Sequence, residues 1–275
     1  MKYELPRGYL SASSIGMLQT CPKQFEFRYV KNIVIPPGKA LVLGSSVHKV
    51  FETYYSDAMS SSSRLTPSQV AELTGDVFEE WLDGNENTLT DADKKEAHAI
   101  LPGMTSLYVE NVGRHIKPLA VEQEVRFETS DGVPLLAYID LRHEKFDAGT
   151  GEAGEGIADY KVTSKRWDAG RLRNSLQFNL YSLMTGIGDI EIHNLLKESG
   201  RAMKRPSTDP GITDYATNLR VLRHHFDGSQ AGHFEQLVES AARLITTGVF
   251  VPCDPTSWAC TPEWCGYWGL CRGRR

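Results

Sequence analysis

The feature that most limits the possible folds of this chain is a change in hydrophobic periodicity near Leu119. Before it, apolar residues recur at helical spacing; after it, they alternate with polar residues, as at Val121, Val125 and Phe127. The first pattern predicts helices and the second predicts strands. We therefore expect helices, then a strand meander, then a mixture of both. This is an α/β (α+β) chain with a mixed sheet, not a regular βαβ repeat.

Caps, turn signals and periodicity predict the individual elements. Ser11 or Ser13 can begin the first helix, and Thr66-Pro67 can begin a later one. The other expected helices cover about 41–55, 69–116 with a break near 83–84, 172–184 and 233–246. The expected strands cover about 121–127, 135–141, 157–162, 190–196 and 215–222. Residues 147–156 contain four glycines and are expected to form a loop or hairpin tip.

Composition excludes several classes of protein. Of the 275 residues, 40% are hydrophobic and 24% are charged, which excludes collagen-like, low-complexity and disordered chains. No apolar run approaches the roughly 18 residues that cross a bilayer, and residues 1–6 contain no apolar signal segment. We therefore expect a cytoplasmic protein that does not contact membranes.

The most informative stretch is Asp159-Tyr160-Lys161, at the end of an expected strand. Because side chains alternate along a strand, Asp159 and Lys161 point to the same face. A carboxylate there can bind a hard divalent cation, and the lysine can orient a water or stabilise developing negative charge. A solvated cross-strand ion pair is the alternative interpretation of the same pattern.

Other potential ligands lie upstream of this stretch. Asp140 follows an apolar strand, and Glu122 and Glu124 share one face of the preceding strand. His48, one helical turn after Gly44, offers an imidazole. Each residue alone also fits an ordinary structural role, so it is their order along the chain that makes a common site plausible.

The five cysteines indicate a second site. Cys260, Cys265 and Cys271 lie within 12 residues without a nearby histidine, a pattern typical of thiolate coordination of a soft metal. A fourth ligand would come from Cys21 or from Cys253. A four-thiolate zinc site and free buried thiols both fit this composition. We expect the neighbouring aromatics to shield the site rather than to stack on bases: Trp258, Trp264, Tyr267 and Trp268.

Taken together, these motifs resemble the PD-(D/E)XK nuclease superfamily. The similarity is to its RecB-like branch, which includes small CRISPR-associated (Cas-four-type) and phage-encoded exonucleases. With the C-terminal cysteines, the matching elements run from residue 11 to residue 271. Alanine stands at 137 where glycine is usual, and valine at 162 where threonine is common. The other matching elements are Ser11-x-Ser13-x(7)-Cys21-Pro22, Gly44-x(3)-His48, Tyr138-Ile139-Asp140, Asp159-Tyr160-Lys161 and Gln177-x(3)-Tyr181.

The resemblance implies a role for each matching residue. His48, Asp140, Asp159 and the carbonyl oxygen of Tyr160 would bind catalytic Mg²⁺ or Mn²⁺. Glu122 would lie in the outer shell of that metal or bind a second ion, with Glu124 as its substitute. Lys161 would position the attacking water. Gln177 and Tyr181 would hold Lys161 and the DNA backbone. Cys21, Cys260, Cys265 and Cys271 would hold a [4Fe-4S] cluster, which leaves Cys253 over.

The charge distribution is compatible with a DNA partner. The net charge of -5 argues against a general nucleic-acid coat. This total, however, combines an acidic segment at 72–96 with a basic segment elsewhere in the chain. Between residues 161 and 173 there are five basic residues and one acid. With Lys161 assigned to chemistry, the expected contacts to the DNA backbone are Lys165, Arg166, Arg171 and Arg173.

We therefore predict a metal-dependent DNA exonuclease that acts on single-stranded ends in recombination, repair, phage replication or CRISPR adaptation. A non-catalytic DNA-binding adaptor and a structure-specific endonuclease are the alternatives. The chain would be a single nuclease domain, 1–275, with a helical insertion at about 56–117, a core at about 118–225 and a cluster formed by Cys21 with 253–275. It could be a monomer or a ring oligomer, with partner proteins from recombination or from CRISPR adaptation.

Overall fold

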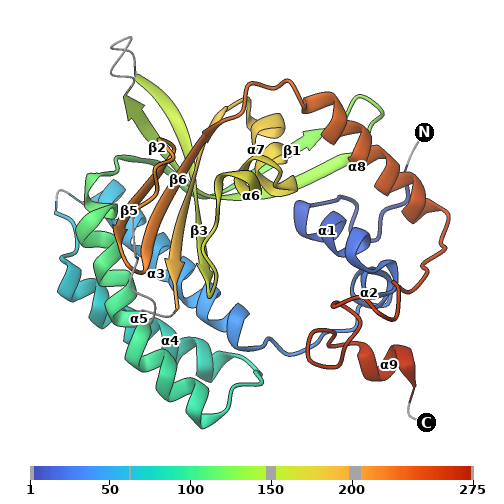
Figure 1. Ribbon diagram of the computed structural model, residues 1–275, viewed down its shortest axis with the longest axis horizontal. Coiled ribbons are helices and arrows are strands. Elements are labelled where there is room, and N and C mark those ends of the chain that lie inside the picture. Colours follow the sequence, from blue (N-terminus) through green and yellow to red (C-terminus); the bar gives the residue numbers. More distant parts are fainter. Residues whose placement is uncertain (1–2, 62, 147–152, 198–205, 274–275) are drawn as a thin grey trace.

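A mixed six-stranded sheet forms the centre of the protein (Figure 1). The computed structural model describes residues 3–61, 63–146, 153–197 and 206–273. The strand order is β1-β2-β3-β4-β6-β5, in which β3 and β4 are parallel and the other neighbours are antiparallel. The expected mixed α/β sheet is therefore confirmed. The strands are β1 (Pro118–Glu128), β2 (Pro134–Phe146), β3 (Ala153–Thr163), β4 (Asp189–Leu196), β5 (Ile212–Ala216) and β6 (Leu219–His225).

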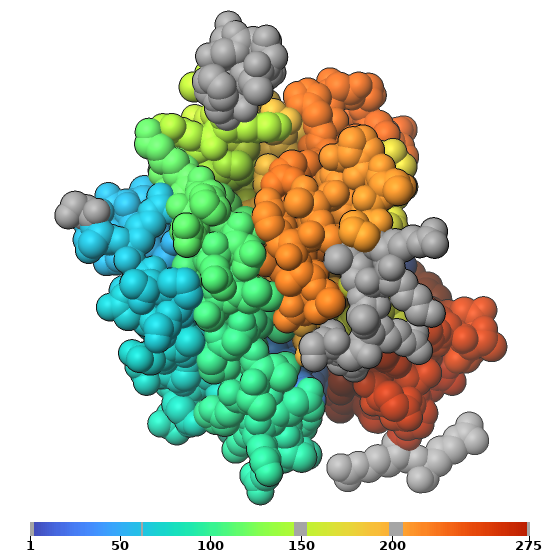
Figure 2. Space-filling view, turned by 60° about the vertical axis from the view of Figure 1, so that its left-hand side comes forward, coloured from blue at the N-terminus to red at the C-terminus, as the bar shows by residue number. Residues whose placement is uncertain are grey.

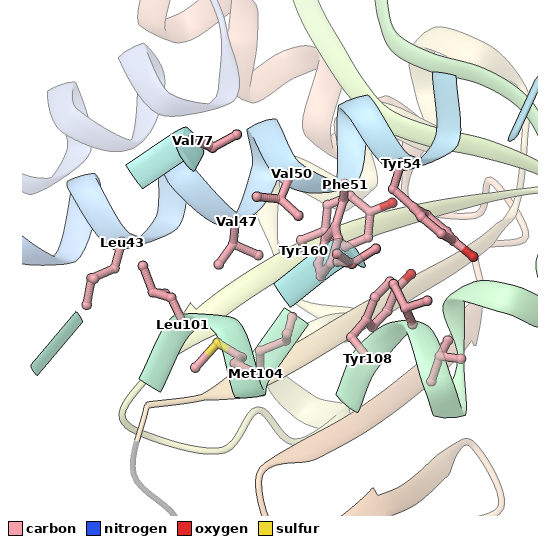
Figure 3. Close-up of a cluster of buried hydrophobic side chains, with 14 of the residues drawn as sticks. Leu43, Val47, Val50, Phe51, Tyr54, Val77, Leu101, Met104, Tyr108 and Tyr160 are labelled. Atoms are coloured by element: carbon pink, nitrogen blue, oxygen red, sulfur yellow. The ribbon is translucent and has the colours of Figure 1, made fainter. Parts of the chain in front are cut away.

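Three long helices cover one face of the sheet: α3 (Lys39–Ser60), α4 (Pro67–Gly84) and α5 (Asp91–Asn111). Thr66 and Thr90 cap α4 and α5 in reciprocal capping boxes. Figure 2 shows α4 and α5, in cyan and green, beside the β5–β6 hairpin in orange. Beneath them Tyr160 of β3 packs edge-on against Phe51 of α3 and Tyr108 of α5 (Figure 3). This core fixes the strand that carries Asp159 and Lys161.

The other face is covered by α1 (Ala12–Thr20), α6 (Ala169–Arg173), α7 (Leu176–Thr185) and α8 (Ala231–Thr246). After α1 the chain continues through α2 (Pro22–Phe25) and a π-helical turn (Glu26–Val30), and a 3₁₀ turn (Gly113–His115) precedes β1. The C-terminal tail, residues 251–273, returns to α2 and ends in α9 (Trp268–Arg272). None of the described helices is long and apolar enough to span a membrane.

Two element predictions were wrong. The expected helix 172–184 is two helices, because the chain breaks at Asn174–Ser175, where the Asn179 amide donates to the carbonyls of Arg173 and Ser175. The expected strand 215–222 is a hairpin, because β5 ends at Ala216 and β6 begins at Leu219. In the expected loop 147–156, residues from 153 onward already belong to β3, and 147–152 lie outside the described residues.

A buried polar network links the sheet to the long helices. The Glu191 carboxylate accepts hydrogen bonds from Arg223 Nε at 3.0 Å and from His193 Nε2 at 3.2 Å. Burial lowers the pKa of His193, so its neutral Nδ1 accepts from the Tyr108 hydroxyl at 2.9 Å. That hydroxyl also lies 2.8 Å from the Tyr55 hydroxyl. Hydrogen bonds thus connect Glu191 and His193 of β4 to Tyr108 of α5 and Tyr55 of α3, and each of these buried polar groups has a partner.

Candidate active site

The site forms where β2 separates from β3. Their paired register ends at Leu141 opposite Ala158, although β2 continues to pair with β1 as far as Pro134. At the point of separation Asp140 Oδ2 accepts a hydrogen bond from the Tyr160 backbone N–H at 3.0 Å. The carboxylate thus replaces the missing strand partner. Asp140 is 7% exposed, so the separation of the strands holds a nearly buried acid.

Glu122 lies on β1 across from Asp140, between the pairs Val121–Leu141 and Gln123–Ile139. Its φ of 45° is rare for a residue with a side chain, and such strain is often found at functional sites. Between Ile139 and Leu141, strand β2 also turns so that these two side chains are buried on opposite faces of the sheet. Leu141 packs under the long helices, whereas Ile139 packs under α6 and α7. This local twist brings Glu122 and Asp140 together.

His48 reaches the same point from α3. Its Nδ1 lies 3.4 Å from Asp140 Oδ2, and its Nε2 donates to the Tyr160 carbonyl oxygen at 3.0 Å. One ligand atom from each of His48, Glu122 and Asp140 lies within 4.8 Å of the other two. Glu124 instead lies on the surface, bound to Arg126. Of the two glutamates considered, the structure therefore brings Glu122 to the site.

The protonation of these groups shows how strongly they interact. Burial and the nearby Asp140 raise the pKa of Glu122 to about 7. Burial alone would lower the pKa of His48, but the Asp140 carboxylate raises it to about 9. Conversely, although burial opposes it, His48 holds the pKa of Asp140 below its usual value. Protons on His48 and Glu122 therefore offset the crowded negative charge, and a bound cation would displace them.

Asp159 and Lys161 lie on the neighbouring strand, facing α7. The Lys161 ammonium lies 2.5 Å from Asp159 Oδ2, yet that buried oxygen has no hydrogen bond of good geometry from the described residues. Burial raises the pKa of Asp159 to about 6. An incompletely satisfied, buried carboxylate oxygen is an energetic cost that a cation would relieve. Asp159 nevertheless remains outside the group formed by His48, Glu122 and Asp140.

Gln177 and Tyr181, one turn apart on α7, hold this carboxylate. The Gln177 amide donates to Asp159 Oδ1 at 2.8 Å and to the Tyr181 hydroxyl at 2.7 Å. The Tyr181 hydroxyl in turn donates to the carbonyl oxygen of Tyr138 at 2.9 Å. This series of hydrogen bonds runs from the β2 backbone through two side chains of α7 and fixes the position of the Asp159 carboxylate. Tyr138 was recognised in the sequence only as part of a motif; its contact with Tyr181 is made by the backbone, which leaves no side-chain signal.

The residues present suit a hard divalent cation. They supply carboxylate oxygens, a backbone carbonyl and one imidazole, the donors that Mg²⁺ and Mn²⁺ accept. A cation would stabilise the buried Asp159 oxygen that lacks a hydrogen bond. It would also take the place of the protons on His48 and Glu122, which lie beside Asp140. Because Asp159 is outside this group, its carboxylate would join the ligands only by turning from Lys161.

The four basic residues expected to contact DNA occupy different environments. Lys165 is exposed. Arg166 donates to a backbone carbonyl in the β5–β6 turn at 2.9 Å, and the Arg171 guanidinium stacks 3.8 Å above the Trp167 ring. Arg173 lines a separate groove beside the end of β6. Contact of these four residues with DNA stays a prediction.

All five cysteines line one small pocket where α2 meets the C-terminal tail: Cys21, Cys253, Cys260, Cys265 and Cys271. The Cys253 N–H donates to Cys21 Sγ at 3.4 Å, and Arg272 donates to Cys260 Sγ at 3.2 Å. No three of their sulfurs all lie within 4.8 Å of one another in the described chain, so the structure shows no preformed metal cage. The pocket does establish that Cys21 and the distant tail are neighbours.

The two expectations for the surrounding aromatics have different outcomes. Tyr267 and Trp268 line the cysteine pocket, which agrees with shielding. Trp258 and Trp264 are 68% and 73% exposed and do not line the pocket, so the shielding prediction is wrong for them. They pack against each other instead, with ring centroids 5.9 Å apart.

Comparison with known proteins adds a family to this geometry. A solved structure titled "Crystal structure of SSO0001" is similar over 81% of this chain and 94% of its own, with 10% identity and a TM-score of 0.38. No curated protein matches the sequence. A model of the PD-(D/E)XK nuclease superfamily matches residues 9–272. Because that match covers nearly the whole sequence and contains the potential metal-binding group, the chain belongs to the PD-(D/E)XK nuclease superfamily of metal-dependent nucleases.

Proposed function

We propose that this protein is a Mg²⁺- or Mn²⁺-dependent deoxyribonuclease of the RecB-like branch that digests DNA as an exonuclease from single-stranded ends. The observation that carries the proposal is the convergence of His48, Glu122 and Asp140 beside the Asp159–Lys161 pair. Strained backbone, buried carboxylates and a lysine at one point of strand separation are costly to maintain in a purely structural role. Hydrolysis of a phosphodiester uses all of them.

Each residue has a role in this proposal. A divalent ion held by His48, Asp140, Asp159 and the carbonyl of Tyr160 would polarise the phosphate and lower the pKa of the attacking water. Lys161 would orient that water and stabilise negative charge on the phosphate. Glu122 would bind the outer shell of the ion. Gln177 holds the Asp159 carboxylate from behind, and Tyr181 holds Gln177.

We also propose that Cys21, Cys260, Cys265 and Cys271 hold a [4Fe-4S] cluster. The support is that these thiols share one pocket. Four-thiolate zinc and free thiols remain the competing states, and Cys253 contacts Cys21 closely enough to compete as a ligand. A cluster would join the two ends of a single nuclease domain, 1–275. Cysteines that coordinate a metal centre suit a reducing compartment, so we place the protein in the cytoplasm.

The biological setting extends this proposal. Recombination, repair, phage replication and CRISPR adaptation all produce DNA ends, and a monomer or a ring oligomer could process them with partner proteins. The motif order shared with RecB-like exonucleases supports these settings. The test of the activity itself does not depend on which setting applies.

The decisive experiment compares end-labelled single-stranded DNA with closed circular DNA, in Mg²⁺ or Mn²⁺. The wild-type protein should degrade the linear strand from its end and leave the circle intact. Lys161→Ala should lower kcat about 10²–10³-fold, the range typical of removing one group that stabilises negative charge in the transition state. Asp159→Asn should abolish turnover. Iron content and the brown colour of anaerobically purified protein would report on the cluster in the same preparation.

Glu122 and Glu124 provide a matched pair of variants on one strand. Glu122→Gln should weaken Mn²⁺ binding and slow cleavage, whereas Glu124→Gln, which changes an exposed carboxylate outside the metal-binding group, should leave Mn²⁺ binding unchanged. Wild-type rates for Asp159→Asn or Lys161→Ala would overturn the catalytic assignment. Cutting of the closed circle would replace the exonuclease with an endonuclease, and a colourless zinc protein would overturn the cluster.

A further inference from the structure

A second groove, of about 490 Å³, begins at the back of the proposed active site. Gln177 and Tyr181 line it, and Gln177 donates to Asp159 Oδ1 at 2.8 Å. From there the groove extends past Tyr138 to the residues that precede and begin α1. We call it the tyrosine groove, and the lining residues used below are Arg7, Tyr9, Ser11, Ser13 and Tyr138.

The tyrosine groove is electrostatically suited to an anionic chain. Arg7 is the one charged side chain among its lining residues, and none of them is a carboxylate. Hydroxyl and amide groups supply the other polar atoms. By contrast, the hollow of about 430 Å³ on the other side of the site is lined by Glu52 and Glu122 as well as by Lys49. A phosphate backbone would therefore meet less repulsion in the tyrosine groove.

Hydrogen-bond donors are available where a phosphate would approach Arg7. The hydroxyls of Ser11 and Ser13 lie 3.0 Å apart at the start of α1. Ser11 Oγ also accepts the N–H of Ser14. Only one of the two hydroxyls can donate to the other, so the second keeps a proton that can be donated to a phosphate. Serine hydroxyls and arginine side chains are among the groups that contact the phosphates of nucleic-acid backbones.

Aromatic surface is exposed in the same groove. The Tyr138 side chain is 50% exposed, and its hydroxyl donates to Glu124 at 2.8 Å, which restrains the ring without covering it. Tyr9 is partly exposed nearby. The Arg7 guanidinium lies 4.6 Å from the centre of the Tyr29 ring, which holds the cation at the groove wall. Tyrosine rings beside a cation are the usual platform for unpaired bases.

We propose that the tyrosine groove binds the unpaired nucleotides next to the scissile phosphate, with a base against Tyr138 and Tyr9 and a phosphate on Arg7, Ser11 and Ser13. The proposal rests on the nuclease function proposed above and identifies its substrate as single-stranded nucleic acid at this subsite. Bases in a duplex are stacked on one another and could not use the rings. The groove thus gives a physical reason for a preference for single strands.

The test measures binding without turnover. A fluorescein-labelled 12-nucleotide oligo(dT) is titrated with protein in EDTA, and fluorescence anisotropy is followed at several salt concentrations. Arg7→Ala should weaken binding about 5- to 10-fold and reduce the slope of log Kd against log salt by about 0.7, the value for one lost phosphate contact to a single strand. Arg28→Ala is the matched control, because Arg28 also lies over Tyr29 but does not line the groove.

The aromatic contacts have a different signature. Tyr138→Ala should weaken binding about 5- to 150-fold, as expected for one lost stacked base, without changing the salt slope. Tyr138→Phe keeps the ring and should bind as the wild type does. Each variant is used only if its melting temperature matches that of the wild type, and Tyr9→Ala provides a second reading of the same contact.

The outcomes separate this inference from the proposed activity. If the wild type cleaves DNA but Arg7→Ala and Tyr138→Ala bind oligo(dT) as tightly as Arg28→Ala, the groove assignment is wrong and the nuclease assignment stands. If the Arg7 and Tyr138 variants bind oligo(dT) more weakly but the wild type cleaves no DNA in Mg²⁺ or Mn²⁺, the groove assignment stands and the nuclease assignment is wrong. Equal binding of a blunt duplex and of oligo(dT) would also overturn the assignment of the groove to single strands.

Discussion

Replacing Glu191 with glutamine should remove a specific part of the protein's sensitivity to acid. Burial opposes the charge of this residue, but hydrogen bonds from His193 and Arg223 hold its pKa at about 2, below the ordinary 4.5. A pKa that is lower in the folded than in the unfolded state stabilises the fold above about pH 4.5, and this stabilisation is lost as the pH falls toward 2. At about 1.4 kcal/mol per pKa unit, the contribution at neutral pH is about 3 kcal/mol.

The measurement is urea unfolding of the wild type and of Glu191→Gln at a series of pH values from about 7 to about 2.5, followed by tryptophan fluorescence. The wild type should be the more stable at pH 7, and most of the difference should disappear between about pH 5 and about pH 2.5. Glu110→Gln, which changes an exposed carboxylate on α5, should follow the wild type throughout. If wild type and Glu191→Gln lose stability with the same pH slope in that window, the network does not hold Glu191 ionised.

Three further predictions concern the core and the two metal sites. Tyr108→Phe removes a hydroxyl from the centre of the buried network and should lower the free energy of unfolding by about 1–3 kcal/mol, measured by urea titration. Mn²⁺ affinity, measured by calorimetry, should rise with pH because both His48, with a pKa of about 9, and Glu122, with a pKa of about 7, must lose a proton when the ion binds: by up to about a hundredfold per unit below pH 7 and by up to about tenfold per unit between pH 7 and pH 9; a pH-independent affinity would contradict this. Cys21→Ser should reduce the iron or zinc content of the purified protein, whereas Cys253→Ser should retain it; the opposite result would make Cys253 the fourth ligand.

The parts of the site that depend on local periodicity could be predicted from the sequence. Alternation along one strand placed Asp159 and Lys161 on one face, and the structure has them 2.5 Å apart. Spacing of one helical turn placed Gln177 and Tyr181 together, and they are hydrogen bonded. The superfamily also followed from the order of the motifs, and the match over residues 9–272 confirms it.

Features that depend on distant parts of the chain could not be predicted. The left-handed backbone of Glu122 and the change of buried face between Ile139 and Leu141 arise where β2 leaves β3. Alternation alone predicts one continuous face there. Likewise, no local pattern distinguishes Glu122 from Glu124, which share a strand face in the simple interpretation; the twist separates them into a site residue and a surface residue.

The break before α7 was missed for a different reason. Residues 172–184 are apolar enough for one helix, and the signal at Asn174–Ser175 is a pair of short polar residues that also occurs within helices. The structure shows that the Asn179 amide, a full turn away, satisfies the carbonyls at the break. A side chain that lies inside the second helix thus ends the first one.

Helix α1 has a consequence for how two places in this molecule are spaced. Its N-cap, Ser11, lies in the wall of the tyrosine groove, and its C-cap, Cys21, lies in the cysteine pocket. A helix of nine residues is about 13 Å long and has little freedom to bend. One short rigid helix therefore sets the distance between the tyrosine groove and the cysteine pocket, so the two places keep a fixed separation along α1.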